Sequence, residues 1–116
     1  MTTEKVKLTE KQFRDSIDIL TKVNDLNFNT LKAVEEMMET SELLVKSLTK
    51  ANKYKPSKAE IIEEIGDTLV RLEILSSHLG ITKDVYERVN SKLALLHNAA
   101  IAGNMGTNII ITKVNE

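Results

Sequence analysis

The stretch from Glu60 to Leu75 constrains this chain more than any other, because it has the pattern of one helix with two different halves. Its first half carries carboxylates along one side, and its second half is apolar around almost the whole helix axis. Because Asp67 stands directly before the apolar half, we expect it to lie near the core. At about 100° per residue, Glu64 and Asp67 lie three positions apart and therefore side by side. Acids that run into an apolar helix need a positive charge beside them, and we expect that charge to be a bound cation.

The rest of the chain predicts an all-α fold of four helices. Thr9 and Ser57 each begin a capping-box pattern, and Gly80 is typical of a residue that ends a helix. We predict helices over about residues 9–23, 30–51, 57–79 and 83–100, with Thr82 as the N-cap of the last. The apolar content of 41 % is mostly Leu, Ile, Val and Met, and the connections are short, so a four-helix bundle is favoured.

The sequence predicts one domain, residues 1–102, followed by a C-terminal tail or arm, residues 103–116. Part of this extension has β character, from Ile109 to Val114, so it is either a short arm or a loosely ordered tail. The second and third helices are apolar over more than a narrow stripe. A four-helix monomer would expose that surface, and we therefore expect a homo-oligomer, either a dimer or a tetramer.

The charge balance limits the expected partners. The net charge is −1 and neither half is strongly basic, which argues against a nucleic-acid partner. No stretch approaches 18 apolar residues, so we expect no membrane partner. The sequence after Met1 lacks the apolar core of a signal peptide, and there is no Cys. These features together predict a cytoplasmic protein.

A second acidic pair lies in the preceding helix, where Glu36 and Glu39 are also three residues apart. If the two helices pack antiparallel, these carboxylates converge with those of Glu64 and Asp67 in one crevice. Oxygen-only ligands select Mg²⁺ or Mn²⁺, and Mg²⁺ is often shared with substrate phosphates. The alternative is a solvated acidic face, in which Arg71 forms an ordinary helix ion pair with Asp67.

Glu36-x-x-Glu39 followed by Glu63-Glu64-Ile65-Gly66-Asp67 resembles the ExxE…ExxD signature of the MazG-like, all-α nucleoside triphosphate pyrophosphohydrolases. Dimeric dUTPases and phosphoribosyl-ATP pyrophosphohydrolases belong to the same superfamily. The resemblance covers about residues 9–97. It places Thr40 where many members have Leu, and a competing register that ends at Glu42 restores that Leu, so Glu42 is the reserve ligand.

The resemblance implies a Mg²⁺-dependent enzyme that cleaves (d)NTPs or related nucleotides to the monophosphate and pyrophosphate. The four acids of the ExxE…ExxD pattern would bind the metal. One of the carboxylates, or a metal-bound water that it orients, would deliver hydroxide to the α-phosphorus. Asn90, Lys92 and Arg71 would bind the substrate, because a Lys of the family's last helix commonly faces the phosphates.

Two other functions stay open. Members often carry a further basic residue soon after the Lys of the last helix, whereas Leu95 and Leu96 stand here. A weaker hold on phosphate favours a protein that binds and sequesters nucleotides without turnover. The third function is a structural helical interaction module whose acids are surface charge. The lack of Trp leaves base recognition unexplained. Its candidates are Asn24, Asn27 and Phe28, which lie in an Asn-rich segment that favours a turn between the first two helices.

Overall fold

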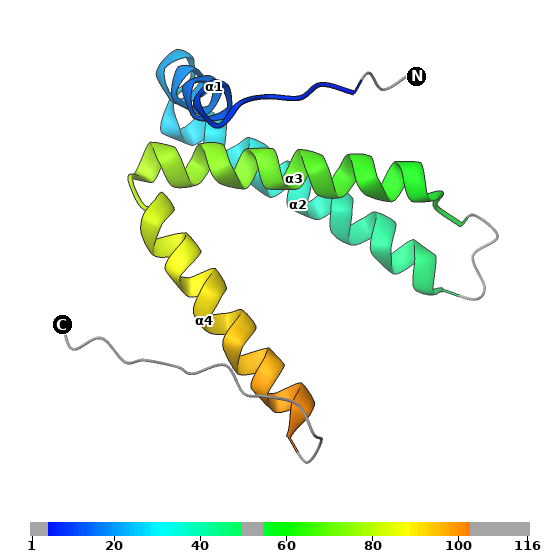
Figure 1. Ribbon diagram of the computed structural model, residues 1–116. Coiled ribbons are helices and arrows are strands. Elements are labelled where there is room, and N and C mark those ends of the chain that lie inside the picture. The colour runs from blue at the N-terminus through cyan, green and yellow to red at the C-terminus, as the bar shows by residue number, and fades with distance from the viewer. Residues whose placement is uncertain (1–4, 50–54, 103–116) are drawn as a thin grey trace. The chain divides into compact units, whose positions relative to one another are not determined.

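The computed structural model describes residues 5–49 and 55–102, and this part of the chain is all-helical, which confirms the predicted all-α class (Figure 1). The arrangement of all four helices as one bundle stays a prediction. The chain divides into two compact units, Met1–Gly80 and Ile81–Glu116. The first unit holds three of the four described helices and the second holds one. Their bounds are α1, Glu10–Val23; α2, Leu26–Leu48; α3, Lys58–Leu79; and α4, Thr82–Ile101.

The helix boundaries of the first unit follow from local side-chain caps. Thr9 Oγ1 accepts from the backbone N–H of Gln12, and the Gln12 side chain accepts from the backbone N–H of Thr9, at 3.1 and 2.9 Å. Ser57 and Glu60 form the same reciprocal pair at the start of α3. Gly80 ends α3 with φ of 68°, a left-handed conformation that suits Gly. All three predicted boundaries are therefore confirmed.

Two other predicted boundaries are wrong. The second helix was expected at about residue 30, but α2 begins at Leu26 because the Asp25 side chain accepts from the backbone N–H of Phe28 at 2.8 Å. Asn27 and Phe28 consequently lie in the first turn of a helix and not in a connection. Thr82 is the first residue of α4 and not its N-cap, which is Ile81 without a side-chain cap bond.

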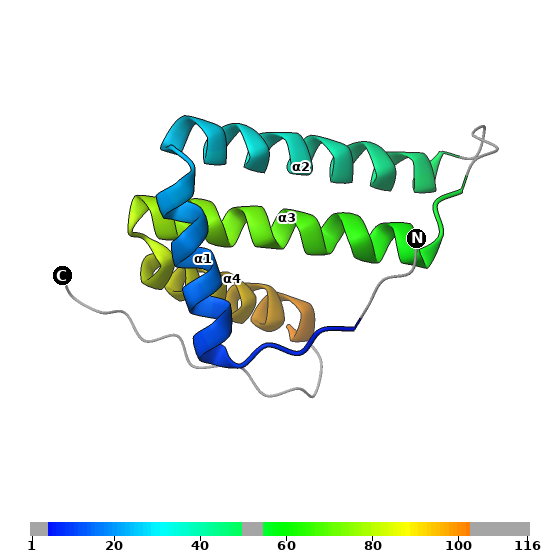
Figure 2. The same cartoon turned by 90° about the horizontal axis from the view of Figure 1, so that it is seen from above.

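In the first unit, α2 and α3 run side by side in opposite directions, and α1 crosses α3 (Figure 2). α3 packs against both other helices. Each helix contributes one fully buried apolar side chain to the core, namely Ile17, Ala33 and Ile74, which are at most 5 % exposed. This small core fixes the antiparallel arrangement that places the acids of α2 opposite those of α3.

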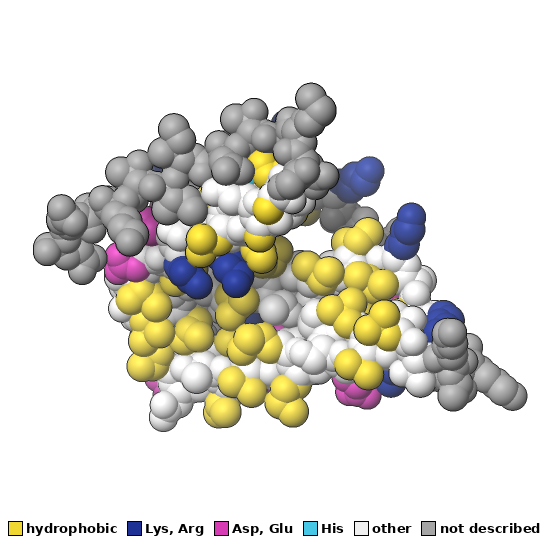
Figure 3. All heavy atoms as spheres, turned by 90° about the horizontal axis from the view of Figure 1, so that it is seen from below, with side chains coloured by type: hydrophobic (Ala, Val, Ile, Leu, Met, Phe, Trp, Pro, Cys, Tyr) yellow, Lys and Arg dark blue, Asp and Glu magenta, His cyan; other side chains and the backbone are white. Residues whose placement is uncertain are grey.

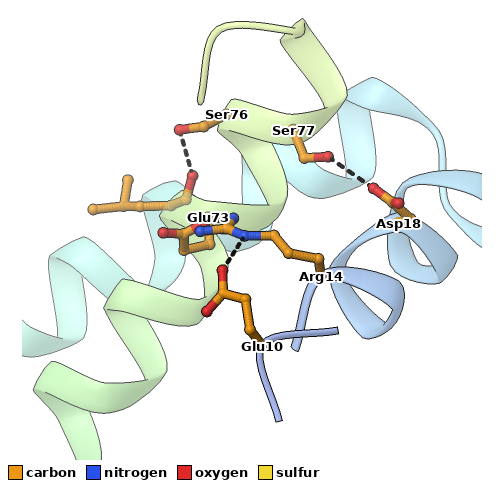
Figure 4. A network of polar contacts seen from close by, with 7 residues as sticks. Glu10, Arg14, Asp18, Glu73, Ser76 and Ser77 are labelled. Atoms are coloured by element: carbon orange, nitrogen blue, oxygen red, sulfur yellow. Dashed lines mark hydrogen bonds and ion pairs between the residues drawn. The ribbon is translucent and has the colours of Figure 1, made fainter. Parts of the chain in front are cut away.

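A polar network joins α1 to α3 (Figure 4). Arg14 reaches across from α1 to Glu73, with 2.8 Å between guanidinium and carboxylate, and it also lies 3.6 Å from Glu10 on its own helix. Ser77 donates to the Asp18 carboxylate at 3.5 Å. The Glu73 side chain is only 11 % exposed, so water solvates its carboxylate poorly. The Arg14 guanidinium balances that charge in place of water.

An apolar face of α2 is exposed. Leu31, Met38 and Leu48 are 67, 67 and 81 % exposed, whereas Ala33 on the side toward α3 is buried. Hydrophobic side chains are also prominent on the surface seen in Figure 3. Such surface is typical of an interface. The homo-oligomer that the sequence predicts stays a prediction.

Some expectations concern other parts of the chain. The predicted arm, residues 103–116, lies outside the described residues, and the domain boundary after residue 102 stays a prediction. Among the four described helices, none is both long and apolar enough to pass through a membrane.

Candidate metal centre

Three of the four predicted ligands meet where α2 lies against α3. Glu36 and Glu39 on α2 and Glu64 on α3 each offer one carboxylate oxygen, and these oxygens lie within 4.8 Å of one another. The i, i+3 spacing on α2 places its two acids on one side of the helix. The antiparallel packing then brings the α3 acid to the same place. We call Glu36, Glu39 and Glu64 the acid cluster.

Two oxygens of the acid cluster are buried without a partner. Glu36 Oε2 and Glu64 Oε2 are shielded from solvent and accept no hydrogen bond. Burial, followed by the charges of Glu39 and Asp67, raises the pKa of the Glu36 carboxyl, and the same causes in the same order raise the pKa of Glu64. Unpartnered carboxylates that crowd one another in this way fit a bound cation.

Asp67, the fourth predicted ligand, lies at the edge of this arrangement. Its charge acts on both buried carboxyls, and it lines a hollow of about 300 Å³ together with Glu36. The expectation that it lies near the core is wrong, because Asp67 is exposed, as are the apolar residues Leu69 and Val70 that follow it. Asp67 is therefore exposed, as Glu39 of the acid cluster is, whereas Glu36 and Glu64 are half-buried.

Arg71 lines the same hollow, whose remaining walls are apolar, and its full lining is Leu20, Glu36, Asp67, Val70, Arg71 and Ile74. Within the described residues, Arg71 and Asp67 form no ion pair, although they lie four residues apart on α3. The hollow therefore combines a guanidinium, two carboxylates and an apolar floor in about 300 Å³. That combination suits a ligand with both an anionic and an apolar part.

Neighbouring acids on α2 have cationic partners of their own. Glu42, the reserve ligand, pairs with Lys46 at 3.1 Å, and Glu35 pairs with Lys32 at 3.1 Å. Neither belongs to the acid cluster. The structure thus brings together the acids of the register that ends at Glu39, whereas Glu42 forms a surface ion pair.

The sequence reasoning missed two threonine residues that join α2 to α3 at the acid cluster. Thr40 Oγ1 and Thr68 Oγ1 are 2.7 Å apart, and each also contacts a backbone carbonyl oxygen of the opposite helix. A signal for them was present: each Thr directly follows the second acid of its pair, in Glu39-Thr40 and Asp67-Thr68. Thr40 was treated only as a departure from a family pattern.

A second missed contact lies between the start of α2 and the end of α3. Asn29 is 1 % exposed, and its Nδ2 lies 3.0 Å from Nδ1 of His78 and 3.4 Å from the carbonyl oxygen of Leu20. Its Oδ1 is buried without a partner. This contact links all three helices of the first unit, and no periodicity in the sequence indicates it.

The predicted substrate-binding residues of the last helix lie in the other unit. Asn90 and Lys92 are exposed on α4, and Lys92 lines a separate hollow of about 500 Å³ with Val85, Arg88, Val89 and Leu93. Of the residues assigned to base recognition, Asn24 is the C-cap of α1. Phe28 is 41 % exposed, with the Lys32 ammonium 5.7 Å from its ring centre. The substrate roles of these residues stay predictions.

Comparison with protein-family models, with curated proteins and with solved structures found no match to this chain.

Proposed function

We propose that this chain is a Mg²⁺-dependent nucleotide pyrophosphohydrolase that cleaves (d)NTPs or related nucleotides to the monophosphate and pyrophosphate. The observation that supports the proposal most is the pair of buried, unpartnered oxygens of Glu36 and Glu64 within the acid cluster. Only oxygen ligands are offered, which suits Mg²⁺ or Mn²⁺. Mg²⁺ needs few protein carboxylates when substrate phosphates supply the remaining oxygens.

Each side chain of the site would have its own role in the hydrolysis. Glu36, Glu39 and Glu64 would hold the cation, which when bound lowers the pKa of water and neutralises charge on phosphate oxygens. Exposed Asp67 would accept the proton of the attacking water. The water oxygen bonds to the α-phosphorus, the bond from that phosphorus to the bridging oxygen breaks, and pyrophosphate leaves. Arg71 would donate hydrogen bonds to the phosphates from within the hollow.

The apolar floor of the hollow supports a nucleoside as the remainder of the ligand. Leu20 from α1 and Val70 and Ile74 from α3 line it beside Arg71. About 300 Å³ is at the lower end of the range for small-molecule sites, which fits part of a nucleotide and not a larger ligand. The exposed apolar face of α2 supports a homo-oligomer as the working form.

A second candidate function, nucleotide binding without turnover, is favoured by one observation. The hollow beside the acid cluster has Arg71 as the one basic residue in its lining. A single guanidinium binds a phosphate group, but it neutralises little of the charge that develops in phosphoryl transfer.

One experiment separates these functions. The purified chain is incubated with Mg²⁺ and each common NTP and dNTP, and pyrophosphate release and melting temperature are followed. Glu63 and Glu64 provide a matched pair, because the two acids are adjacent on α3 and only Glu64 belongs to the acid cluster. Turnover that is lost in Glu64→Gln and kept in Glu63→Gln supports the enzyme.

Other outcomes have equally definite meanings. A nucleotide-dependent rise in melting temperature without pyrophosphate release supports sequestration. If neither Mg²⁺ nor any nucleotide changes the melting temperature or yields pyrophosphate, both functions are wrong, and the acids are surface charge on a structural helical module.

A further inference from the structure

We propose that Thr40 and Thr68 are positioning residues of the cation site. Their paired hydroxyls hold α2 and α3 at one separation, and that separation favours a small divalent ion over a larger one. The inference rests on the proposed cation site, and it concerns two side chains that act on the ligands and not on the ion itself.

The hydroxyl pair is attached to the backbones that carry the two buried carboxylates. Thr40 Oγ1 lies 3.0 Å from the carbonyl oxygen of Glu64. Thr68 Oγ1 lies 3.2 Å from the carbonyl oxygen of Glu36 and 2.9 Å from that of Glu64. Both threonine residues are half-buried. Every contact of the pair therefore ends on the other Thr or on one of the two acids whose Oε2 has no partner.

Counting protons shows that the pair always links the helices. Two hydroxyl protons serve four contacts, and the 2.7 Å contact between the hydroxyl oxygens needs one of them. If Thr40 donates to Thr68, then Thr68 donates to one of the two carbonyl oxygens. If Thr68 donates to Thr40, then Thr40 donates across the interface to Glu64. In each arrangement, at least one hydrogen bond crosses from α2 to α3 beside the acid cluster.

The size of Thr matters as much as its hydroxyl. A 2.7 Å contact between side chains of opposite helices requires the two backbones to lie close together. A larger side chain at position 40 or 68 would separate them. The Thr after the second acid of each pair thus sets how far the α2 carboxylates stand from Glu64.

Ligand separation discriminates between cations. Mg²⁺ requires near-octahedral geometry with oxygens at about 2.0–2.1 Å, whereas Ca²⁺ accepts about 2.3–2.6 Å and irregular coordination. The oxygens of the acid cluster lie within 4.8 Å of one another. Two oxygens that bind one Mg²⁺ can be at most about 4.2 Å apart, against about 5 Å for Ca²⁺, so Mg²⁺ needs the two helices to be held more closely. Loosening the helix pair should therefore weaken Mg²⁺ binding more than Ca²⁺ binding.

The test measures cation affinity directly on the full chain. Mn²⁺ is titrated with detection of the free ion by electron paramagnetic resonance, and Mg²⁺ and Ca²⁺ are measured by competition. Thr40→Val and Thr68→Val remove one hydroxyl each while keeping side-chain shape. We expect each variant to lower Mg²⁺ affinity by about tenfold, the effect of removing a group that orients metal ligands. Ca²⁺ affinity should fall by less than about threefold, because its geometry is adaptable.

Two controls separate positioning from general stability. Thr40→Ser restores the hydroxyl and should bind Mg²⁺ within about threefold of the original chain. Thr21→Val removes a hydroxyl whose bond, 2.7 Å to the carbonyl oxygen of Asp18, lies within α1. It should leave the ratio of Mg²⁺ to Ca²⁺ affinity unchanged. Circular dichroism identifies any variant that fails to fold, and if one Val variant does, the other carries the test.

The outcomes distinguish this inference from the proposed function. If the original chain binds Mn²⁺ and both Val variants bind all three ions equally well, the positioning role is overturned and the cation site stands. The role is also overturned if Mg²⁺ and Ca²⁺ affinities fall by the same factor, because that is loss of structure and not of selectivity. If the original chain binds no divalent cation, the proposed function fails together with this inference.

Discussion

The two interfaces of α3 differ in whether a buried carboxylate has a cationic partner. At the α1 side, Glu73 is nearly buried and receives Arg14 at 2.8 Å. At the α2 side, Glu64 has a buried oxygen without a partner and lies against other acids. One helix thus carries a balanced acid and an unbalanced acid nine residues apart. The first contributes to stability, and the second keeps an electrostatic cost that a ligand can relieve.

The largest expected effect concerns the unbalanced side. Glu64→Gln should lower Mg²⁺ or Mn²⁺ affinity by about 100-fold or more, because it removes the charge of a metal ligand. Loss of a group that only orients a metal ligand already lowers metal affinity by about 10- to 100-fold. Glu63→Gln, its exposed neighbour, should change affinity by less than about threefold. Titration with Mn²⁺ measures both. Equal losses in the two variants would show that net charge, and not the acid cluster, attracts the ion.

A substitution at the α1 side of α3 should change the stability of the fold and not its cation affinity. Arg14→Ala leaves the Glu73 carboxylate without its cross-helix partner, and we expect a loss of about 1–3 kcal/mol in the free energy of unfolding. Cation affinity should stay unchanged. Urea unfolding and Mn²⁺ titration of the same variant check the two halves of the prediction. A variant that keeps full stability would mean that Glu73 is balanced by other contacts.

The pH dependence of stability should distinguish the two sides. Burial and neighbouring acids raise the pKa of Glu36 and Glu64 above 4.5, so the folded state holds their protons more tightly than the unfolded state. Their contribution to stability is therefore complete below pH 4.5 and is lost as pH rises through the raised values. Without cation, Glu64→Gln should lose less stability than the original chain over this rise.

Urea unfolding with a chelator, and then with Mg²⁺, measures this effect. Mg²⁺ binds the deprotonated carboxylates, so its stabilisation of the original chain should grow with pH. Glu64→Gln should show little of either trend. If the original chain and the variant have parallel stability curves in both conditions, the raised pKa of Glu64 does not matter to folding.

The difference between the interfaces also explains what the sequence could predict. Capping boxes at Thr9 and Ser57 and the C-cap at Gly80 are local patterns, and the structure confirms them. The pairing of acids three residues apart is equally local. Which acid becomes buried is not, because it depends on how α2 and α3 face each other. Asp67 was expected near the core and lies exposed for this reason.

The periodicity of the sequence could not predict contacts between side chains of different helices. Nothing in the sequence distinguishes Thr40 and Thr68 from other helix residues. Their hydroxyls form a contact only because α2 and α3 pack against each other. The resemblance assigned substrate binding to Lys92, which lies in the second unit, and that role stays a prediction. The start of α2 was missed because the Asn-rich segment was interpreted as a turn, although Asp25 caps a helix there.

The smallest expected effect tests whether any unpartnered buried atom behaves like the acid cluster. Asn29 Oδ1 is also buried without a partner, but it is neutral. Asn29→Leu loses the contacts to His78 and Leu20 and also removes this unsatisfied oxygen, so the two changes largely offset. We expect a change of about 1 kcal/mol or less in the free energy of unfolding. Cation affinity, measured by Mn²⁺ titration, should not change. A loss of affinity would place Asn29 in the metal site, and charge would no longer be what separates the two interfaces of α3.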